Sequence, residues 1–284
     1  MPSWPAAGFT LVEALVALVL SSIVMILVST TFVVQSGYYA SQHQSVGAHD
    51  NARAATDLMA SEIRSVMEGG VLVAGARTLT VRAPFVLGAV CARAGSGLPM
   101  DVQSDGGRAA LDTTEVAGFA VRDPVTAGWS YYNVPWATLR ITGGVPASNC
   151  ADNGADTTGA RSDFYRLRNL ETYHTSGVAE GGVFMLFRQT TFRIDDSVLE
   201  PGSLALFRQP YGGQAVEFAT GMDTTARFRY RTGGATYADT VFAGSLDDID
   251  VVRITADARK RAPTGGRDDV TFGWTVNVAL RNVR

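Results

Sequence analysis

The chain has 284 residues and a formal net charge of −3, with 46% hydrophobic and 18% charged residues. This length is enough for one or two domains with a sizeable core. The near-neutral charge gives no long-range attraction for nucleic acid, so no nucleic-acid partner is expected.

The first predicted element is a membrane-length helix. Residues 14–34, ALVALVLSSIVMILVSTTFVV, are all apolar or small hydroxyl types. This is about the 20 residues that a helix needs to cross a hydrocarbon core about 30 Å thick. The serine and threonine hydroxyls can return hydrogen bonds to the helix backbone, so they do not prevent spanning.

A single carboxylate, Glu13, precedes this run, and no Asp, Glu, Lys or Arg follows it until Asp50. A cleaved secretory signal is disfavoured, because MPSWPAA has no basic residue and the apolar run is too long. A signal anchor explains the length but not Glu13, since an acid at the centre of a bilayer costs about 2.5–3.5 kcal/mol. Cleavage between Gly8 and Phe9 would explain it. Glu13 would then be the fifth residue, where its carboxylate can pair with the new amino terminus of a neighbouring subunit.

Residues 8–13, GFTLVE, followed by a long apolar helix, resemble the class III signal of type IV pilins and type II secretion pseudopilins. The resemblance implies that a prepilin peptidase cuts between Gly8 and Phe9 and methylates the new amino group of Phe9. It also implies that Glu13 acts in assembly. The sequence departs from the family in one respect, because the leader contains none of the usual Lys or Arg.

The helix is predicted to continue as an amphipathic segment over 36–69 and to end at Gly69-Gly70. Its apolar positions recur at steps of three and four and are Ala55, Leu58, Met59, Ile63, Val66 and Met67. The stretch AHDNARAATDLMASEIRSVMEGG is similar to the helix that follows the membrane segment in the PilW and GspJ groups of minor subunits.

Beyond residue 70 the pattern changes to a period of two, which is typical of half-buried antiparallel strands. The clearest strands are predicted at 226–231 and 271–280, and shorter ones at 79–81, 116–121, 139–142, 183–188, 203–207 and 250–255. The segments 91–115 and 143–182 are rich in turn-forming residues and are predicted to be long loops. The row of Arg227, Arg229 and Arg231 is interpreted as a solvated strand face.

Cys91 and Cys150 do not form a zinc-binding pattern. In an exported protein we expect them to form a disulfide, and two unpaired thiols are the alternative. Asp247, Asp248 and Asp250 are weak calcium candidates, whose spacing matches no EF-hand loop; a solvated turn is the preferred interpretation. The sequence contains no nucleophile elbow, zinc-protease motif or P-loop, so neither an enzyme nor a cofactor is expected.

The sequence therefore predicts an α+β, type IV pilin-like fold. Its parts are a leader (1–8), a transmembrane and filament-core helix (9–35), an amphipathic continuation (36–69) and a β-rich head (70–284). The predicted function is a minor pilin in a pilus assembly or tip-initiation complex. The alternatives are a type II secretion pseudopilus tip subunit and a tip module for adhesion or DNA uptake. The resemblance implies an inner-membrane protein with a cytoplasmic N-terminus and a periplasmic head, later part of a filament. Implied partners are other pilins, the prepilin peptidase, the assembly platform and the lipid bilayer.

Overall fold

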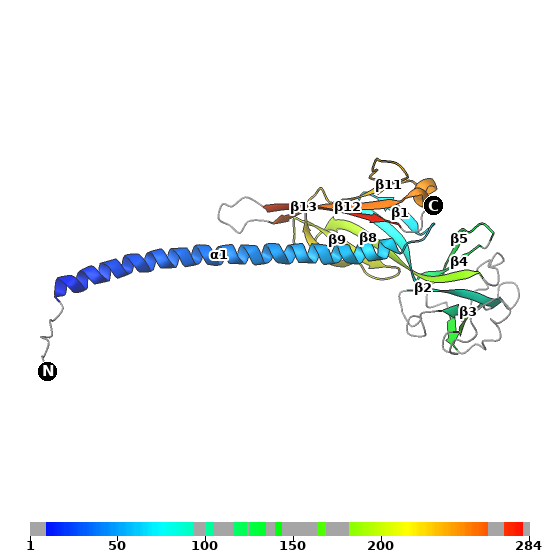
Figure 1. Cartoon of the computed structure of the whole chain (residues 1–284), viewed down its shortest axis with the longest axis horizontal. Helices are drawn as coiled ribbons and strands as arrows, with labels where there is room; N and C mark the ends of the chain where they lie inside the picture. The colour runs from blue at the N-terminus through cyan, green and yellow to red at the C-terminus, as the bar shows by residue number, and fades with distance from the viewer. Residues whose placement is uncertain are drawn as a thin grey trace, which may run out of the picture. The chain divides into compact units, whose positions relative to one another are not determined.

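The computed structural model describes residues 10–93, 100–104, 116–123, 125–134, 140–143, 164–168, 182–260 and 270–280. The chain divides into two compact units, Met1–Asp50 and Asn51–Arg284. Helix α1 (Leu11–Arg64) begins in the first unit and ends in the second. Antiparallel strands make up most of the second unit (Figure 1). A long helix followed by an antiparallel sheet confirms the predicted α+β, pilin-like fold class.

The described strands form one antiparallel sheet of thirteen. They are β1 (Val71–Gly75), β2 (Thr78–Arg93), β3 (Met100–Ser104), β4 (Gly118–Arg122), β5 (Trp129–Asn133), β6 (Arg140–Gly143), β7 (Phe164–Arg168), β8 (Val183–Asp196), β9 (Leu204–Pro210), β10 (Val216–Met222), β11 (Arg227–Arg231), β12 (Val251–Lys260) and β13 (Val270–Ala279). A short 3₁₀ helix, η3 (Ala243–Asp248), precedes β12.

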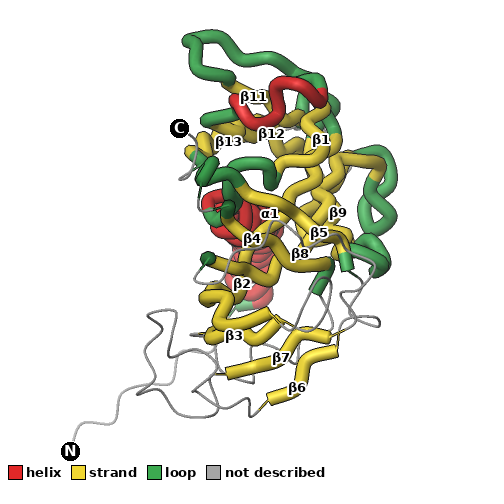
Figure 2. The backbone as a smooth tube through the Cα atoms, turned by 90° about the vertical axis from the view of Figure 1, so that its right-hand side faces the viewer, coloured by secondary structure: helices red, strands yellow, loops and turns green. Residues whose placement is uncertain are grey.

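The long pair of β2 and β8 is the centre of the sheet, which branches at both ends of this pair (Figure 2). On one side β8 pairs with β9, and the order continues through β10 to β12, which lies between β11 and β13. On the other side β2 pairs with β1 through its first residues and with β3 through its last, and β3 is followed by β7 and β6. The β4–β5 hairpin lies on the same edge of β8 as β9, where β4 pairs with the first half of β8.

Each predicted strand overlaps an observed one, but the strands predicted at 79–81 and 183–188 are much longer in the structure, as β2 and β8. The prediction of continuous loops at 91–115 and 143–182 was wrong. Strands β3 and β7 lie within these segments, and β2 extends to Arg93. These two strands are five residues long and lie between turn-forming residues, so their alternation was too short to detect. Strands β1, β5 and β10 were also not predicted. The other residues of the two segments are outside the described ranges.

The second unit is built around the C-terminal part of α1. Ala55, Met59, Ala60, Ile63 and Val66 are buried in one cluster with side chains from the sheet. Leu58, predicted to be in this stripe, is instead 49% exposed. Because successive helical residues are about 100° apart, a stripe that includes Ala60 leaves Leu58 outside its margin.

Helix α1 ends at Arg64, before the predicted stop at Gly69-Gly70. Its last turn tightens through i→i−3 bonds, in which the Ser65 and Val66 amides donate to the Glu62 and Ile63 carbonyls. A turn at Met67–Gly70 follows, with Gly69 at φ +74°. A Cβ atom at Gly70 would lie 2.7 Å from Cγ1 of Val66, so the glycine pair allows the sharp turn into β1.

Candidate functional site

Helix α1 begins with a capping box formed by Thr10 and Glu13. Thr10 is the N-cap residue and Glu13 is the third residue of the helix. The backbone N–H and the hydroxyl of Thr10 donate to Oε2 of Glu13 at 3.1 and 3.0 Å, and the Glu13 amide approaches the Thr10 hydroxyl oxygen at 3.4 Å. The carboxylate thus satisfies an otherwise unpaired donor at the helix start. The Thr-x-x-Glu spacing is visible in the sequence, but Thr10 was not among the predicted site residues.

The capping arrangement uses only one oxygen of the Glu13 carboxylate. Among the described residues, no hydrogen bond or ion pair reaches Oε1, and the side chain is exposed. The carboxylate can therefore cap its own helix through Oε2 and still accept a hydrogen bond from another molecule through Oε1.

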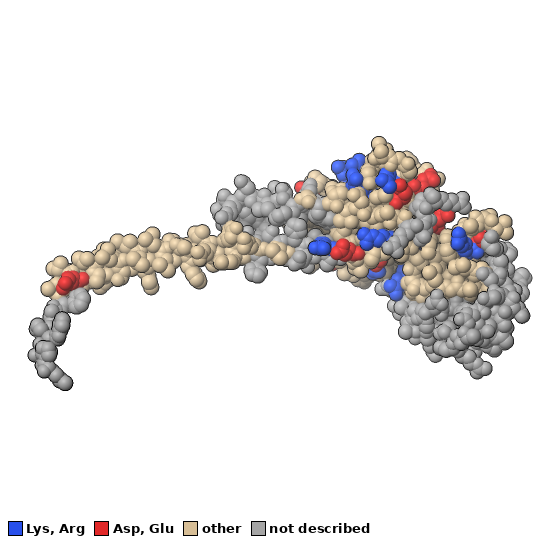
Figure 3. All heavy atoms as spheres, viewed as in Figure 1, with Lys and Arg blue, Asp and Glu red and all other residues tan. Residues whose placement is uncertain are grey.

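The helix that follows presents apolar side chains outward over its full circumference. Every residue of Leu11–Tyr39 is exposed, and this is the one stretch among the described residues that is long and apolar enough to span a membrane. In Figure 3 the surface of residues 14–39 carries no charged side chain. The Ser22 hydroxyl donates to the Val19 carbonyl, and the Thr30 and Thr31 hydroxyls donate to the Leu27 carbonyl. For these three residues the bonds confirm that the hydroxyl is satisfied within the helix.

Residues 5–29 match the family model for the prokaryotic N-terminal methylation motif. The chain carries a prepilin-type N-terminus. This N-terminus supports a type IV pilin or pseudopilin-type subunit. Families with this motif are structural rather than catalytic, and the motif suggests association in general with other pilins and the prepilin peptidase. It is compatible with a single-pass membrane anchor. No curated protein and no solved structure matches the chain.

The structure of the prepilin-type N-terminus begins one residue after the predicted cleavage point. Gly8 and Phe9 lie outside the described residues, so cleavage between them stays a prediction. Membership of the PilW or GspJ group also stays a prediction, because the matched residues end before the segment that carries that resemblance.

The three arginines of the row in the second unit form ion pairs with aspartates. Arg229 Nε lies 2.9 Å from Asp239 Oδ1, Arg227 Nη1 lies 3.8 Å from Asp239 Oδ2, and Arg231 Nη2 lies 2.8 Å from Asp250 Oδ2. Two aspartates thus offset the three guanidinium groups, which argues against an anion-binding row.

The weak calcium candidates gain no support from this geometry. Arg231 holds both carboxylate oxygens of Asp250, and these hydrogen bonds lower the pKa of Asp250. Asp247 and Asp248 lie exposed in η3. Within the described ranges, no group of three His, Cys, Asp or Glu residues is arranged to hold a metal ion. Cys150 is outside the described residues, as is the side chain of Cys91, so their disulfide stays a prediction.

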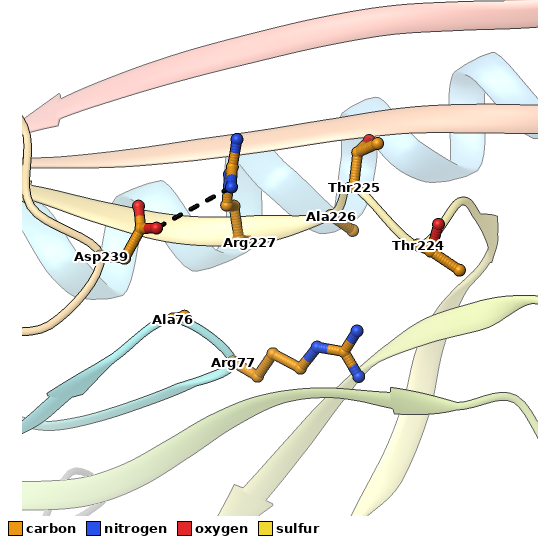
Figure 4. Close-up of a pocket in the computed structure, with 7 residues that line it drawn as sticks. All are labelled: Ala76, Arg77, Thr224, Thr225, Ala226, Arg227 and Asp239. Carbon is orange, nitrogen blue, oxygen red and sulfur yellow. Dashed lines mark ion pairs between the residues drawn. The ribbon is translucent and has the colours of Figure 1, made fainter.

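A hollow of about 370 Å³ lies between the β1–β2 turn and the segment leading into β11 (Figure 4). Its lining is Ala76, Arg77, Thr224, Thr225, Ala226, Arg227 and Asp239. The lining contains no histidine or cysteine, and its one carboxylate faces Arg227 and Arg229. The hollow therefore offers no paired nucleophile and base for covalent catalysis.

Proposed function

We propose that the chain is a minor pilin: a structural subunit of a type IV pilus assembly or tip-initiation complex, cut by a prepilin peptidase between Gly8 and Phe9. The precursor is inserted in the inner membrane with its N-terminus cytoplasmic and its head periplasmic. Phe9 is then N-methylated, and the subunit moves from the bilayer into the filament. The matched methylation motif and the exposed apolar helix support this proposal.

The observation that carries the proposal is the position of Glu13 at the start of a helix that has no other charged residue until Asp50. Cleavage after Gly8 would create a positive amino terminus four residues before this carboxylate. In apolar surroundings an unpaired charge is expensive, and a hydrogen-bonded partner of opposite sign removes much of that cost. Oε1 of Glu13, which no described residue contacts, gives a neighbouring subunit's amino terminus a place to bind, and this contact would fix the axial register of the two helices.

The mass of the mature protein tests the processing step. Protein purified from the membranes of its native host should begin at Phe9 and carry one methyl group. The Gly8→Ala variant should remain an uncut precursor, while Ala7→Ser, a change next to the same bond, should be processed normally. A normal mature mass from Gly8→Ala, or a wild-type protein that still begins with Met1, would reject the proposal.

A further inference from the structure

Strand β13 has one edge that no described strand covers. It pairs with β12 over ten consecutive residues, from Val251↔Ala279 to Lys260↔Val270, without a bulge. Among the described strands, β12 is its only partner. The opposite edge of β13 is therefore a row of backbone donors and acceptors without strand partners in the part of the chain that the structure describes.

The hydrogen bonds at the end of this pair show which backbone groups point outward. The Leu280 amide donates to the Asp250 carbonyl at 2.9 Å, so the amide of Leu280 faces β12. In a regular antiparallel pair the direction alternates with each residue. The backbone N–H and C=O groups of Val276 and Val278 therefore point toward β12. Those of Gly273, Thr275, Asn277 and Ala279 point away from it. The residues at these last four positions are exposed, whereas Val278 is fully buried.

This edge lacks the features that normally prevent strand addition. Natural edge strands are protected by charged side chains, prolines, bulges or short length. From residue 273 to 279 the sequence GWTVNVA contains no charge and no proline. On the neighbouring strand β12, Arg253 and Asp257 lie opposite Asn277 and Gly273. Arg253 donates to Asn277 Oδ1 at 2.8 Å and lies 3.6 Å from the centroid of the Tyr237 ring, so it is already engaged. Gly273 has no side chain to keep another backbone at a distance.

We propose that the outer edge of β13 binds an extended strand from the head of a different pilin-type subunit. The binding would continue the antiparallel sheet from one subunit into the next, with main-chain hydrogen bonds to Gly273, Thr275, Asn277 and Ala279. This inference rests on the proposed pilin function. It adds to that function by naming the surface and the kind of segment that it receives.

The alternatives to a different subunit fit the edge less well. Lipid tails offer no hydrogen bonds, so a membrane surface cannot satisfy the exposed backbone groups. Two copies of β13 could pair only antiparallel about a two-fold axis, which would reverse one chain relative to the other. Neighbouring subunits of a helical filament in which all subunits point the same way are related head to tail and not by such an axis, so symmetrical pairing of two β13 edges is not expected between neighbours in the filament.

Cross-linking from two positions tests the proposal on the full-length protein in membranes of its native host. A photoreactive amino acid is placed at Gly273 in one variant and at Asn277 in another. Both cross-links should join a subunit that itself has a prepilin-type N-terminus. The two cross-linked residues of that subunit should lie in one segment, four residues apart, because paired strands have the same rise per residue. Cross-links only within the chain, only to a second copy, or to no pilin-type subunit would overturn the proposal.

A proline substitution tests the main-chain contact itself. Thr275→Pro removes an outward N–H and no hydrogen bond to β12, while Thr275→Val keeps that N–H. Cross-linking from Asn277 should fall at least about tenfold in Thr275→Pro and remain near normal in Thr275→Val. If Thr275→Pro unfolds, Thr275→Lys replaces it. Its control is Thr255→Lys, which adds the same charge at the residue opposite Thr275 on the inner strand β12.

The mature mass of each sample separates failure of this inference from failure of the proposed function. Wild-type protein that is cut and methylated but gives no intersubunit cross-link overturns the strand pairing alone. Wild-type protein that is never processed overturns the pilin function. Equal cross-linking by Thr275→Pro and wild type would also overturn the strand pairing.

Discussion

At the scale of single residues, Glu13 has one observed role, as a helix cap, and one proposed role, in assembly, and a substitution can separate the two. As the third residue of α1 it caps the helix through Thr10, and glutamine can do this as well as glutamate. As the proposed partner of a neighbouring amino terminus it must carry a negative charge. A substitution that keeps the hydrogen bonds and removes the charge therefore distinguishes a helix cap from an assembly contact.

We expect Glu13→Gln to be processed to the normal mature mass but to reduce filament incorporation at least about tenfold, because a neighbour's amine would lose its counter-charge. Thr10→Ala removes the hydroxyl from the cap and leaves the charge, so it should still assemble. The measurement is the amount of each variant in sheared filaments relative to its amount in membranes. Wild-type incorporation of Glu13→Gln would show that Glu13 is only a helix cap.

At the scale of secondary-structure elements, an ion pair joins α1 to the sheet. Arg208 of β9 contacts Glu62 of the helix at 2.9 Å, and the two side chains are only 22% and 18% exposed. The second oxygen of Glu62, Oε2, is buried without a hydrogen-bond partner among the described residues. A partly buried pair of this kind matters more to stability than an exposed one, because removal of one charge leaves the other in poorly hydrated surroundings.

Glu62→Ala should destabilise the head by about 1–3 kcal/mol, because it removes the carboxylate that faces Arg208. Asp57→Ala is the matched control. Asp57 pairs with Arg53 on the same helix at 3.9 Å, with both side chains at least 75% exposed, so its loss should change stability by less than about 0.5 kcal/mol. Urea unfolding of both variants gives the two changes in the free energy of unfolding. Equal changes would show that burial does not determine how much these ion pairs contribute to stability.

The same scale shows how much of the structure could be predicted from the sequence. The apolar run and the alternating segments predicted α1 and most of the longer strands, because each pattern spans enough residues to exclude other structures. Strand β1, VLVAG, was missed because its residues are mostly apolar and do not alternate in hydrophobicity. The paired state of Arg229 could not be predicted, since Asp239 reaches it through a loop ten residues later. Thr10 was missed although its spacing to Glu13 is a known capping signal.

At the scale of the whole molecule, the boundary at Asp50 and Asn51 predicts which part of the chain can fold alone. The second unit contains its own core, to which α1 contributes Met59, Ala60 and Ile63. Loss of a buried methionine or isoleucine side chain costs about 2–5 kcal/mol, and a whole domain is stable by only about 5–15 kcal/mol. The last turns of α1 are therefore part of the head and not a detachable stalk.

A fragment of residues 51–284 should be folded and unfold cooperatively on heating, whereas residues 68–284, which lack the buried helical stripe, should not fold. Circular dichroism and thermal unfolding distinguish the two results. A cooperative transition in the shorter fragment would show that the helix is dispensable for the core. Failure of the longer one would show that the head requires residues before Asn51.

The uniformly apolar surface of residues 14–34 restricts the route by which such a subunit could leave the bilayer. Each large aliphatic side chain moved from hydrocarbon to water costs about 1.5–3 kcal/mol, and this stretch consists mostly of such residues. A free subunit in the aqueous compartment would therefore be far too unstable to act as an intermediate. Extraction would have to be direct: each helical turn would leave the lipid only as it packs against helices that are already in the filament. For the same reason, retraction would return subunits to the membrane without a stage in solution.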